Sequence, residues 1–319
     1  PCKQDNKQSN MKATRLKWTP AVIMALTMTL AACSNEETVN DPLADGPVAA
    51  QVTAGIGQSM TRVSVDDNGS AAFTTGDVIH VVADRTSAYD YTLQDGGSWS
   101  AGSNPYYFQD RNSVDFQAWY ANPALSTSAN TITIDTQTQP IGSNRWNQWD
   151  ILVTPVVSTS VSSPEINFTG NNAFSHIMTQ LVFIFKAGND IGDLSALTGY
   201  TVKNVTTDAT FNTQSCDLTT GSTTGDIAMT VTGEADNQVD CTPIIMVPQT
   251  VSGTLNLEVT YNGQTYKAAL NPPTGGLQTG YSYTYTVTIS NTGLEVGNAT
   301  IGNWDQHADF DGNGEATLQ

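Results

Sequence analysis

Cys33 is the residue whose type and position most directly indicate chemistry. It closes the tetrapeptide Leu-Ala-Ala-Cys at 30–33, whose small residues fit a peptidase cleft, so cleavage would leave the cysteine thiol at a new N-terminus as a lipid acceptor. Met11 begins a basic stretch, and the apolar run 21–32 follows it, the order typical of an export signal. The run is too short to span a bilayer comfortably. We therefore expect residues 1–32 to comprise upstream sequence plus a lipoprotein signal peptide.

Two further cysteines, Cys216 and Cys241, follow the export signal. Both lie in polar, loop-like stretches of the same half of the chain, and an exported protein enters an oxidising environment. A disulfide between them and two separate free thiols therefore remain open alternatives. Neither cysteine belongs to a C-x-x-C pair or to a Cys/His spacing that would indicate a metal site.

Catalytic signatures are scarce in this sequence. It contains no G-x-S-x-G nucleophile elbow, no P-loop and no glycine fingerprint after a strand. His80, His176 and His307 have no second histidine at ligand spacing, and His80 lies in an apolar run typical of a core strand. The stretch 309–314 matches only the first half of a calcium loop. We predict no catalytic residue, no cofactor and no metal, and a hydrolase with a dispersed acid pair is the least favoured class.

Trp146 and Trp149 lie in a polar stretch rich in Asn and Gln. An exposed indole face stacks on sugar rings, so this pair is a candidate site for glycan stacking. The competing interpretation is a loop tryptophan that plugs the end of a β-sandwich, and it is the favoured one.

The amino-acid composition indicates an all-β extracellular protein. Thr, Ser, Asn, Gly, Val and Tyr are abundant while Lys, Glu and Leu are scarce, so strand and turn formers prevail over helix formers. The chain has 12 basic and 30 acidic residues, and 1–32 holds five of the basic and one of the acidic ones, which leaves a net charge of about −22 from Cys33 onward. This acidity argues against nucleic acid and against an anionic membrane surface as partners.

Strand-like runs separated by turn residues fill the chain after the export signal. They comprise 48–56, 77–83, 89–93, 114–120, 131–134, 150–157, 180–185, 201–205, 209–212, 226–231, 243–249, 254–261, 264–270 and 281–289. The apolar run 180–185 is expected to be a central strand, and 189–197 is expected to form one short turn of helix. We predict a flexible tether over 33–47, an N-terminal β-sandwich domain over 48–168 and a C-terminal β-sandwich domain over 169–319.

Taken in order, several segments resemble the fimbrillin family, the type V pilins of diderm anaerobes. The segments are 60–62 (MTR), 73–79 (FTTGDVI), 114–120 (VDFQAWY), 150–153 (DILV), 174–181 (FSHIMTQL), 247–250 (VPQT), 280–287 and 299–304 (ATIGNW). The match spans the export signal and nearly all of the chain that follows it. It implies an all-β fold, a two-domain transthyretin-like antiparallel β-sandwich, and a location at the cell surface as an outer-membrane lipoprotein of a Gram-negative bacterium.

The resemblance also implies proteolytic processing. In this family an arginine-specific protease cuts in the loop after the first strand, and the matching bond here joins Arg62 to Val63. Cleavage would release the segment that holds 48–56, and a strand from another subunit would fill the apolar groove left behind. The implied partners are other pilus subunits, the processing protease, the lipid anchor in the outer membrane, and a host or microbial surface receptor.

Residues 305–319 depart from the family pattern. The family's shaft subunits donate a strand from their C-terminal region, but this stretch is acidic, glycine-bearing and poor in alternating apolar residues. Either the donor lies further upstream, or the subunit accepts a strand without donating one. We expect a structural subunit or a tip or accessory adhesin of a pilus, without enzymatic activity. The alternative is an anchored surface lipoprotein that binds glycans through Trp146 and Trp149.

Overall fold

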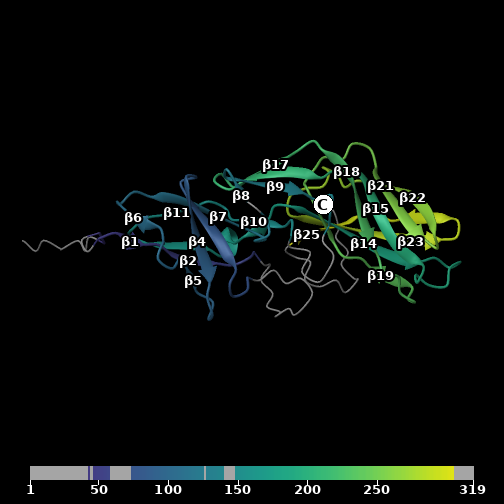
Figure 1. The fold of residues 1–319 in the computed structure, drawn as a ribbon, viewed down its shortest axis with the longest axis horizontal. Coiled ribbons are helices and arrows are strands. Elements are labelled where there is room, and N and C mark those ends of the chain that lie inside the picture. Colours follow the sequence, from purple (N-terminus) through teal and green to yellow (C-terminus); the bar gives the residue numbers. More distant parts are fainter. Residues whose placement is uncertain (1–41, 44–45, 58–72, 126, 140–147, 305–319) are drawn as a thin grey trace, which may run out of the picture. The chain divides into compact units, whose positions relative to one another are not determined.

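The computed structural model describes residues 42–43, 46–57, 73–125, 127–139 and 148–304 (Figure 1). Regular structure in these residues is almost entirely β-strand, and the one helical element bounded within them is the 3₁₀ helix η2 (Gly170–Asn172). The prediction of an all-β fold is confirmed.

The predicted helical turn over 189–197 is wrong. This stretch forms turns and bends before a strand begins at Leu197. The Asp193 carboxylate accepts hydrogen bonds from both the backbone N–H and the hydroxyl of Ser195, at 2.8 and 2.5 Å. Such a local side-chain turn competes with helical hydrogen bonding and replaces it here.

A seven-stranded sheet organises the first half of the chain, with strand order β13-β10-β7-β3-β4-β5 and β11 also paired to β7. All of its pairings are antiparallel. Its strands are β3 (Val78–Ala83), β4 (Ser87–Leu93), β5 (Trp99–Ser100), β7 (Val114–Ala121), β10 (Ile151–Val153), β11 (Val157–Thr159) and β13 (Ser175–His176). The predicted strand 150–157 is thus two strands, because Pro155 has no N–H to continue the ladder.

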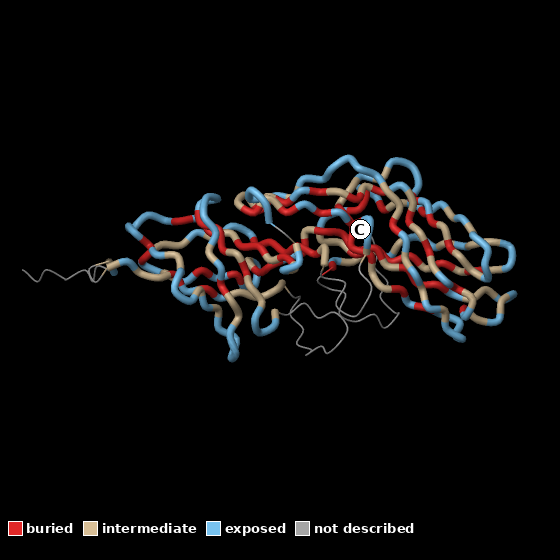
Figure 2. Tube along the Cα trace, in the orientation of Figure 1, coloured by how far each residue is buried: buried red, intermediate tan, exposed pale blue. Residues whose placement is uncertain are grey.

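Two short strand pairs complete this half. They join β1 (Val48–Ala49) antiparallel to β6 (Tyr107–Phe108), and β2 (Gln51–Ala54) parallel to β12 (Glu165–Phe168). Apolar side chains from these pairs and from the large sheet form one buried group, here called the N-terminal cluster: Ala50, Val52, Ile79, Val81, Ala83, Tyr91, Phe108, Val114, Phe116, Ala118, Leu152, Val161, Ile166, Phe168 and Phe174. Along β7 buried and more exposed residues alternate over 114–118, so one face of the strand joins the cluster. Figure 2 shows the burial of the described residues along the Cα trace, with exposed segments gathered at the loops.

Two sheets form the second half. The first has strand order β19-β14-β23-β24, with β20 also on β14 and β25 also on β23. The second has order β18-β15-β21-β22. The bounds are β14 (Thr179–Ala187), β15 (Leu197–Thr206), β18 (Thr224–Thr230), β19 (Gln238–Asp240), β20 (Ile244–Met246), β21 (Leu255–Tyr261), β22 (Gln264–Leu270), β23 (Tyr281–Ser290), β24 (Gly293–Val296) and β25 (Thr300–Asn303). Apolar side chains of both sheets share one core, so the sheets pack as a sandwich. This core is here called the C-terminal cluster: Leu181, Phe183, Phe185, Leu194, Leu197, Tyr200, Val202, Val205, Ile227, Val239, Cys241, Ile244, Met246, Leu255, Leu257, Val259, Leu270, Leu277, Tyr283, Tyr285, Val287 and Ile289. The predicted central position of 180–185, within β14, is confirmed.

A further sheet combines strands from both halves of the chain. Its order is β17-β16-β9-β8, with β8 (Thr127–Ser128) and β9 (Thr131–Asp135) from the first half and β16 (Asp208–Asn212) and β17 (Asp217–Thr220) from the second. Beneath it lies a third apolar group, the central cluster, which likewise mixes residues of both halves: Val82, Trp119, Ala121, Ile132, Ile134, Ile151, Val153, Met178, Ala209, Phe211, Cys216, Ile245, Val247 and Trp304. The boundary at 168/169 between two domains stays a prediction.

Candidate functional site

The first strand of the chain, β1 and β2, is the element that the resemblance singles out. Its backbone is bonded at both ends: the Ala50 N–H donates to Tyr106 O at 2.8 Å, and the Gly57 N–H donates to Phe174 O at 2.7 Å. Between these points, β2 pairs in parallel with β12 over four residues, and the Gln51 N–H donates to Pro164 O at 2.9 Å. The first strand is therefore an integral part of the folded chain.

Side chains of the first strand alternate as a half-buried strand requires. Ala50 and Val52 are each 6% exposed and belong to the N-terminal cluster, whereas Gln51 and Thr53 are exposed. Val48, Ala54 and Ile56 are partly buried and pack against the same cluster. Removal of this strand would open the N-terminal cluster to solvent.

Side chains, rather than a second strand, hold the other edge of β2. In the described part of the chain its one strand partner is β12. On the remaining edge, the Tyr91 hydroxyl lies 3.5 Å from Ala50 O and the Trp99 indole N–H donates to Ala54 O at 3.3 Å. Burial raises the pKa of the Tyr91 hydroxyl, so it stays a neutral donor. The first strand is thus held by the two short ladders β1–β6 and β2–β12, by backbone bonds from Ala50, Gly55 and Gly57, and by two side-chain contacts.

The predicted processing site lies outside the described residues. Arg62 and Val63 fall within 58–72, and Cys33 likewise is not described. Both flanks of 58–72 meet at one place, because Gly57 bonds to the backbone of Phe174 and the Phe73 ring packs edge-to-face on the Phe174 ring at 5.2 Å. The lipidation and processing residues stay predictions.

Of the predicted pair of tryptophans, Trp146 is outside the described residues. Trp149 is half-buried, packs against the central cluster and donates its indole N–H to Thr138 O at 2.9 Å. Its contacts match the plugging interpretation, and the glycan role of the pair stays a prediction.

Cys216 and Cys241 are both free, buried thiols. The first belongs to the central cluster and the second to the C-terminal cluster, so the disulfide alternative is not formed in this structure. Burial raises the pKa of each thiol to about 12, which keeps both protonated and unreactive at neutral pH.

The two histidines that the structure describes, His80 and His176, are each paired with a carboxylate and stacked on a tryptophan. His80 lies 2.6 Å from Asp90 and stacks on Trp119 with ring centroids 3.9 Å apart. The His80 interpretation as a satisfied structural residue agrees with these contacts. No group of three or more His, Cys, Asp or Glu side chains is placed to hold a metal ion within the residues that the structure describes.

One arrangement was not found from the sequence. His176 and Asp150 are 3% and 1% exposed, with Nδ1 of the histidine 2.8 Å from Oδ1 of the aspartate. The Trp304 ring stacks parallel on the imidazole at 4.3 Å, and its backbone N–H donates to Gly280 O. Asp150, His176 and Trp304 lie in the segments 150–153, 174–181 and 299–304, which carry the resemblance. Membership in these segments was the one feature of the sequence that could have indicated the arrangement. The arrangement fastens the end of β25 to β13 and to the residue before β10.

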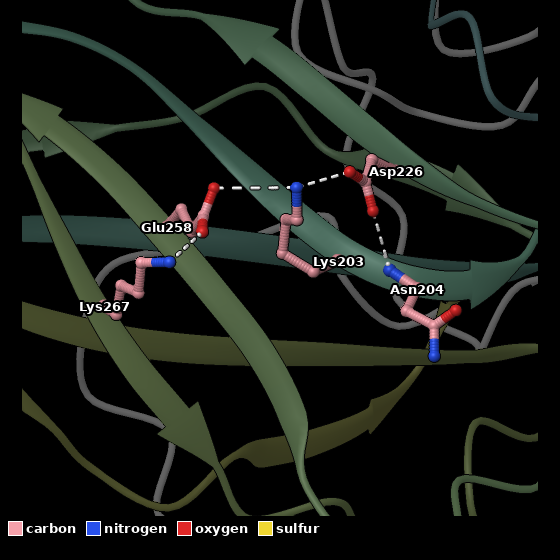
Figure 3. A network of polar contacts seen from close by, with 5 residues as sticks. All are labelled: Lys203, Asn204, Asp226, Glu258 and Lys267. Atoms are coloured by element: carbon pink, nitrogen blue, oxygen red, sulfur yellow. Dashed lines mark hydrogen bonds and ion pairs between the residues drawn. The ribbon is translucent and has the colours of Figure 1, made fainter.

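Figure 3 shows a ladder of charges across the second-half sheet β18-β15-β21-β22. Asp226 of β18 pairs with Lys203 of β15, which lies 3.6 Å from Glu258 of β21, and Glu258 accepts from Lys267 of β22 at 2.9 Å. The hydrogen bond from Lys203 lowers the pKa of Asp226, and the bond from Lys267 lowers that of Glu258. Asn204, with φ of 54°, turns its N–H to Asp226 at a bulge in β15. The ladder fixes strand register and offers no cleft.

Comparison with known proteins identifies the family to which this chain belongs. The family model described as fimbrillin-like matches residues 61–304, most of the chain, so the chain belongs to the fimbrillin-like family. No curated protein matches the chain. Two similar solved structures are candidate cell adhesion proteins from Bacteroides uniformis and Bacteroides ovatus. Each is 22% identical with a TM-score of 0.62, and the alignments cover 81% of this chain and 99% and 98% of those chains.

The family defines the class of protein. Fimbrillin-like proteins are structural and adhesive components of cell-surface fimbriae and not enzymes, so this chain is a pilus subunit or adhesin that associates with other pilus subunits. The likeness to the two solved structures shows the shared β-sandwich fold. No helix among the described residues has the length and apolarity needed to cross a membrane.

Proposed function

We propose that the chain is exported as an outer-membrane lipoprotein on Cys33, is cleaved between Arg62 and Val63 by an arginine-specific protease, and then joins a pilus by strand exchange. The observation that carries the proposal is the way the first strand is held. It contributes to the N-terminal cluster, yet only short backbone ladders among the described residues bind it to the rest of the chain: β1 to β6 over two residue pairs and β2 to β12 over four.

The energetics suit a replaceable strand. Complete burial of a valine side chain contributes about 1.5–3 kcal/mol, so Val52 and its partly buried neighbours hold the strand firmly while the chain is intact. Once the chain is cut downstream, the released strand no longer benefits from being part of the same molecule. A strand of another subunit with the same alternation of apolar residues can then take its place, with backbone bonds supplying affinity and side chains setting register.

The test uses purified full-length chain with Cys33→Ser, which removes the lipid acceptor. Limited digestion with an arginine-specific protease should release the segment that ends at Arg62 and yield strand-exchanged oligomers on size exclusion. The matched control, Arg62→Ala in the same background, should stay uncut at this bond and monomeric. If the cleaved protein kept residues 48–61 bound and formed no oligomer, the result would contradict strand exchange.

A further inference from the structure

A groove of about 650 Å³ opens between β2 and the β4–β5 hairpin. Residues 50–54 form one wall, the hairpin residues 96–102 form another, and Glu165 and Thr169 lie along it. This volume lies within the range of small-molecule sites, about 300–1,000 Å³. Trp149 is not among the described residues that line it.

The groove combines one aromatic platform with several hydroxyl groups. Trp99 is partly exposed along it, while the Phe73 ring packs against the indole at 87° with centroids 5.2 Å apart, which fixes the indole plane. Four hydroxyl-bearing residues line it, Thr53, Ser98, Ser100 and Thr169, and the Thr53 hydroxyl donates to Oε1 of the Glu165 carboxylate at 3.3 Å. An indole beside hydroxyls and a carboxylate matches the apolar face and the outward hydroxyls of a sugar ring.

The edge of β2 that faces the hairpin is unsuited to a further strand. Ala50 O lies against the Tyr91 hydroxyl, Ala54 O accepts from the Trp99 indole, and the Ala50 N–H is bonded to Tyr106 O. An added strand would have to displace these contacts before it could form a ladder. The occupant is therefore recognised by side chains and not by backbone pairing.

The charge of the groove and of the chain restricts the class of sugar that could bind. Among the described lining residues, Glu165 is the one that carries a carboxylate or an amine, and the full chain has a net charge of −18. The resulting negative electrostatic potential repels anionic sugars, so neutral sugars are the expected ligands. At the hairpin tip, Gly96 and Gly97 have φ of 92° and 86°, a conformation that favours glycine, so no side chain covers the groove there.

We propose that this groove binds a neutral oligosaccharide, with Trp99 stacking on a sugar ring and Glu165 accepting hydrogen bonds from its hydroxyls. The site belongs to the uncleaved chain and goes beyond strand exchange, since one wall of the groove is the first strand itself. Its failure would leave the strand-exchange mechanism untouched, because that mechanism is read from cleavage and oligomerisation.

The test is titration of the full-length Cys33→Ser protein with neutral hexasaccharides of glucose, mannose and galactose, after selection on a glycan array. We expect Trp99→Ala to abolish binding and Glu165→Gln to weaken it at least about tenfold, the effect of losing one charge-assisted hydrogen bond. Glu165 is exposed, so Glu165→Gln tests the site without disturbing the fold. Glu295→Gln, an exposed carboxylate on β24 that is not among the described lining residues, is the matched control for Glu165→Gln and should leave affinity unchanged.

Three outcomes would overturn the proposal. They are a folded protein that binds no neutral glycan on the array, binding that survives both Trp99→Ala and Glu165→Gln, and binding of sialylated glycans alone. A fourth outcome would also overturn it: if an extended peptide bound in the groove and no sugar did, the groove would be a site for a protein partner.

Discussion

Two parallel strand ladders lie among the described residues, and they are held in different ways. In the second half, β14 pairs with β23 over eight residues, and each strand has antiparallel neighbours on its other edge, β19 and β20 for one and β24 and β25 for the other. In the first half, β2 pairs with β12 over four residues, and two side chains hold its other edge. The same pairing geometry thus occurs in a strand with ladders on both edges and in the strand that we propose to be exchanged.

This difference indicates which strand of the fold could be exchanged during assembly. β14 cannot leave without breaking ladders on both edges and opening the C-terminal cluster. In the proposed mechanism the first strand would leave by breaking two short ladders, β1–β6 and β2–β12, and the cluster that it opens is separate from the other two. In the proposed mechanism, loss of the first strand would therefore open the N-terminal cluster and leave the other two clusters buried.

The largest expected effect is on β14. Phe183 is fully buried and stacks with Tyr285 at 5.9 Å. Phe183→Ala should lower the free energy of unfolding by about 3–5 kcal/mol in urea denaturation, because it removes an aromatic ring from the C-terminal cluster. Glu295→Ala on β24, which is exposed, should change it by less than about 0.5 kcal/mol. A cost below about 1 kcal/mol at Phe183 would show that this sandwich is not the stable body of the molecule.

A smaller and local effect is expected on β2. Val52→Ala removes two buried methyl groups, about 2 kcal/mol, from the contact of the first strand with the N-terminal cluster. Hydrogen exchange of β2 amides should speed up roughly 30-fold, while β14 and β23 amides keep their protection. The control is Gln51→Ala, an exposed neighbour that should leave both rates unchanged. Equal acceleration in β14 would contradict the separation of the two regions.

The two thiols report whether loss of the first strand stays local. In a chain with Cys2→Ser and Cys33→Ser, neither Cys216 nor Cys241 should react with a thiol reagent at pH 8, because burial raises the pKa of both to about 12. Cleavage and release of the first strand should leave them unreactive, since neither lies in the N-terminal cluster. Rapid labelling of Cys241 after release would mean that the C-terminal cluster opens as well.

The smallest effect concerns the charge ladder of the second half. The pKa values of Asp226 and Glu258 are lowered by hydrogen bonds from lysines, so their contribution to stability is present above about pH 4 and is lost as the pH falls through the folded values. The hydrogen bond to Asp226 raises the pKa of Lys203, so its contribution is present below about pH 10.5 and is lost as the pH rises through the folded value.

The ladder is tested by the melting temperature as a function of pH. The double variant Asp226→Asn, Glu258→Gln should lose part of its acid dependence, and the difference from the parent should shrink in high salt because the side chains are partly exposed. Glu295→Gln, outside the ladder, is the control. An acid transition identical in the parent and the double variant would show that the ladder does not contribute.

Local periodicity was enough to predict most strands. The apolar run 180–185 identified the central strand β14, and the alternation over 114–120 identified β7. What the sequence did not predict depends on contacts between distant residues: the parallel pairing of β2 with β12, and the sheet that joins β9 to β16. Periodicity states which face of a strand is buried, and not which strand lies beside it.

The candidate site was predictable to the same extent. The first strand followed from its apolar pattern and its role from the resemblance. The groove around Trp99 could not be foreseen, because its walls come from residues more than 40 positions apart. Trp146 and Trp149 are close together in the sequence and so were predicted as a pair. The surroundings of the Trp99 indole, by contrast, form only when the hairpin folds against the first strand.

The central claim is that the first strand leaves when the protein enters the fibre. The most direct measurement is the N-terminal residue of the protein on intact cells, obtained by surface labelling, shearing of the fibres and mass spectrometry. Val63 at the N-terminus, with residues 48–61 missing from the fibre, is the expected result. A surface protein that still begins at a lipidated Cys33 and retains residues 48–61 would contradict the claim.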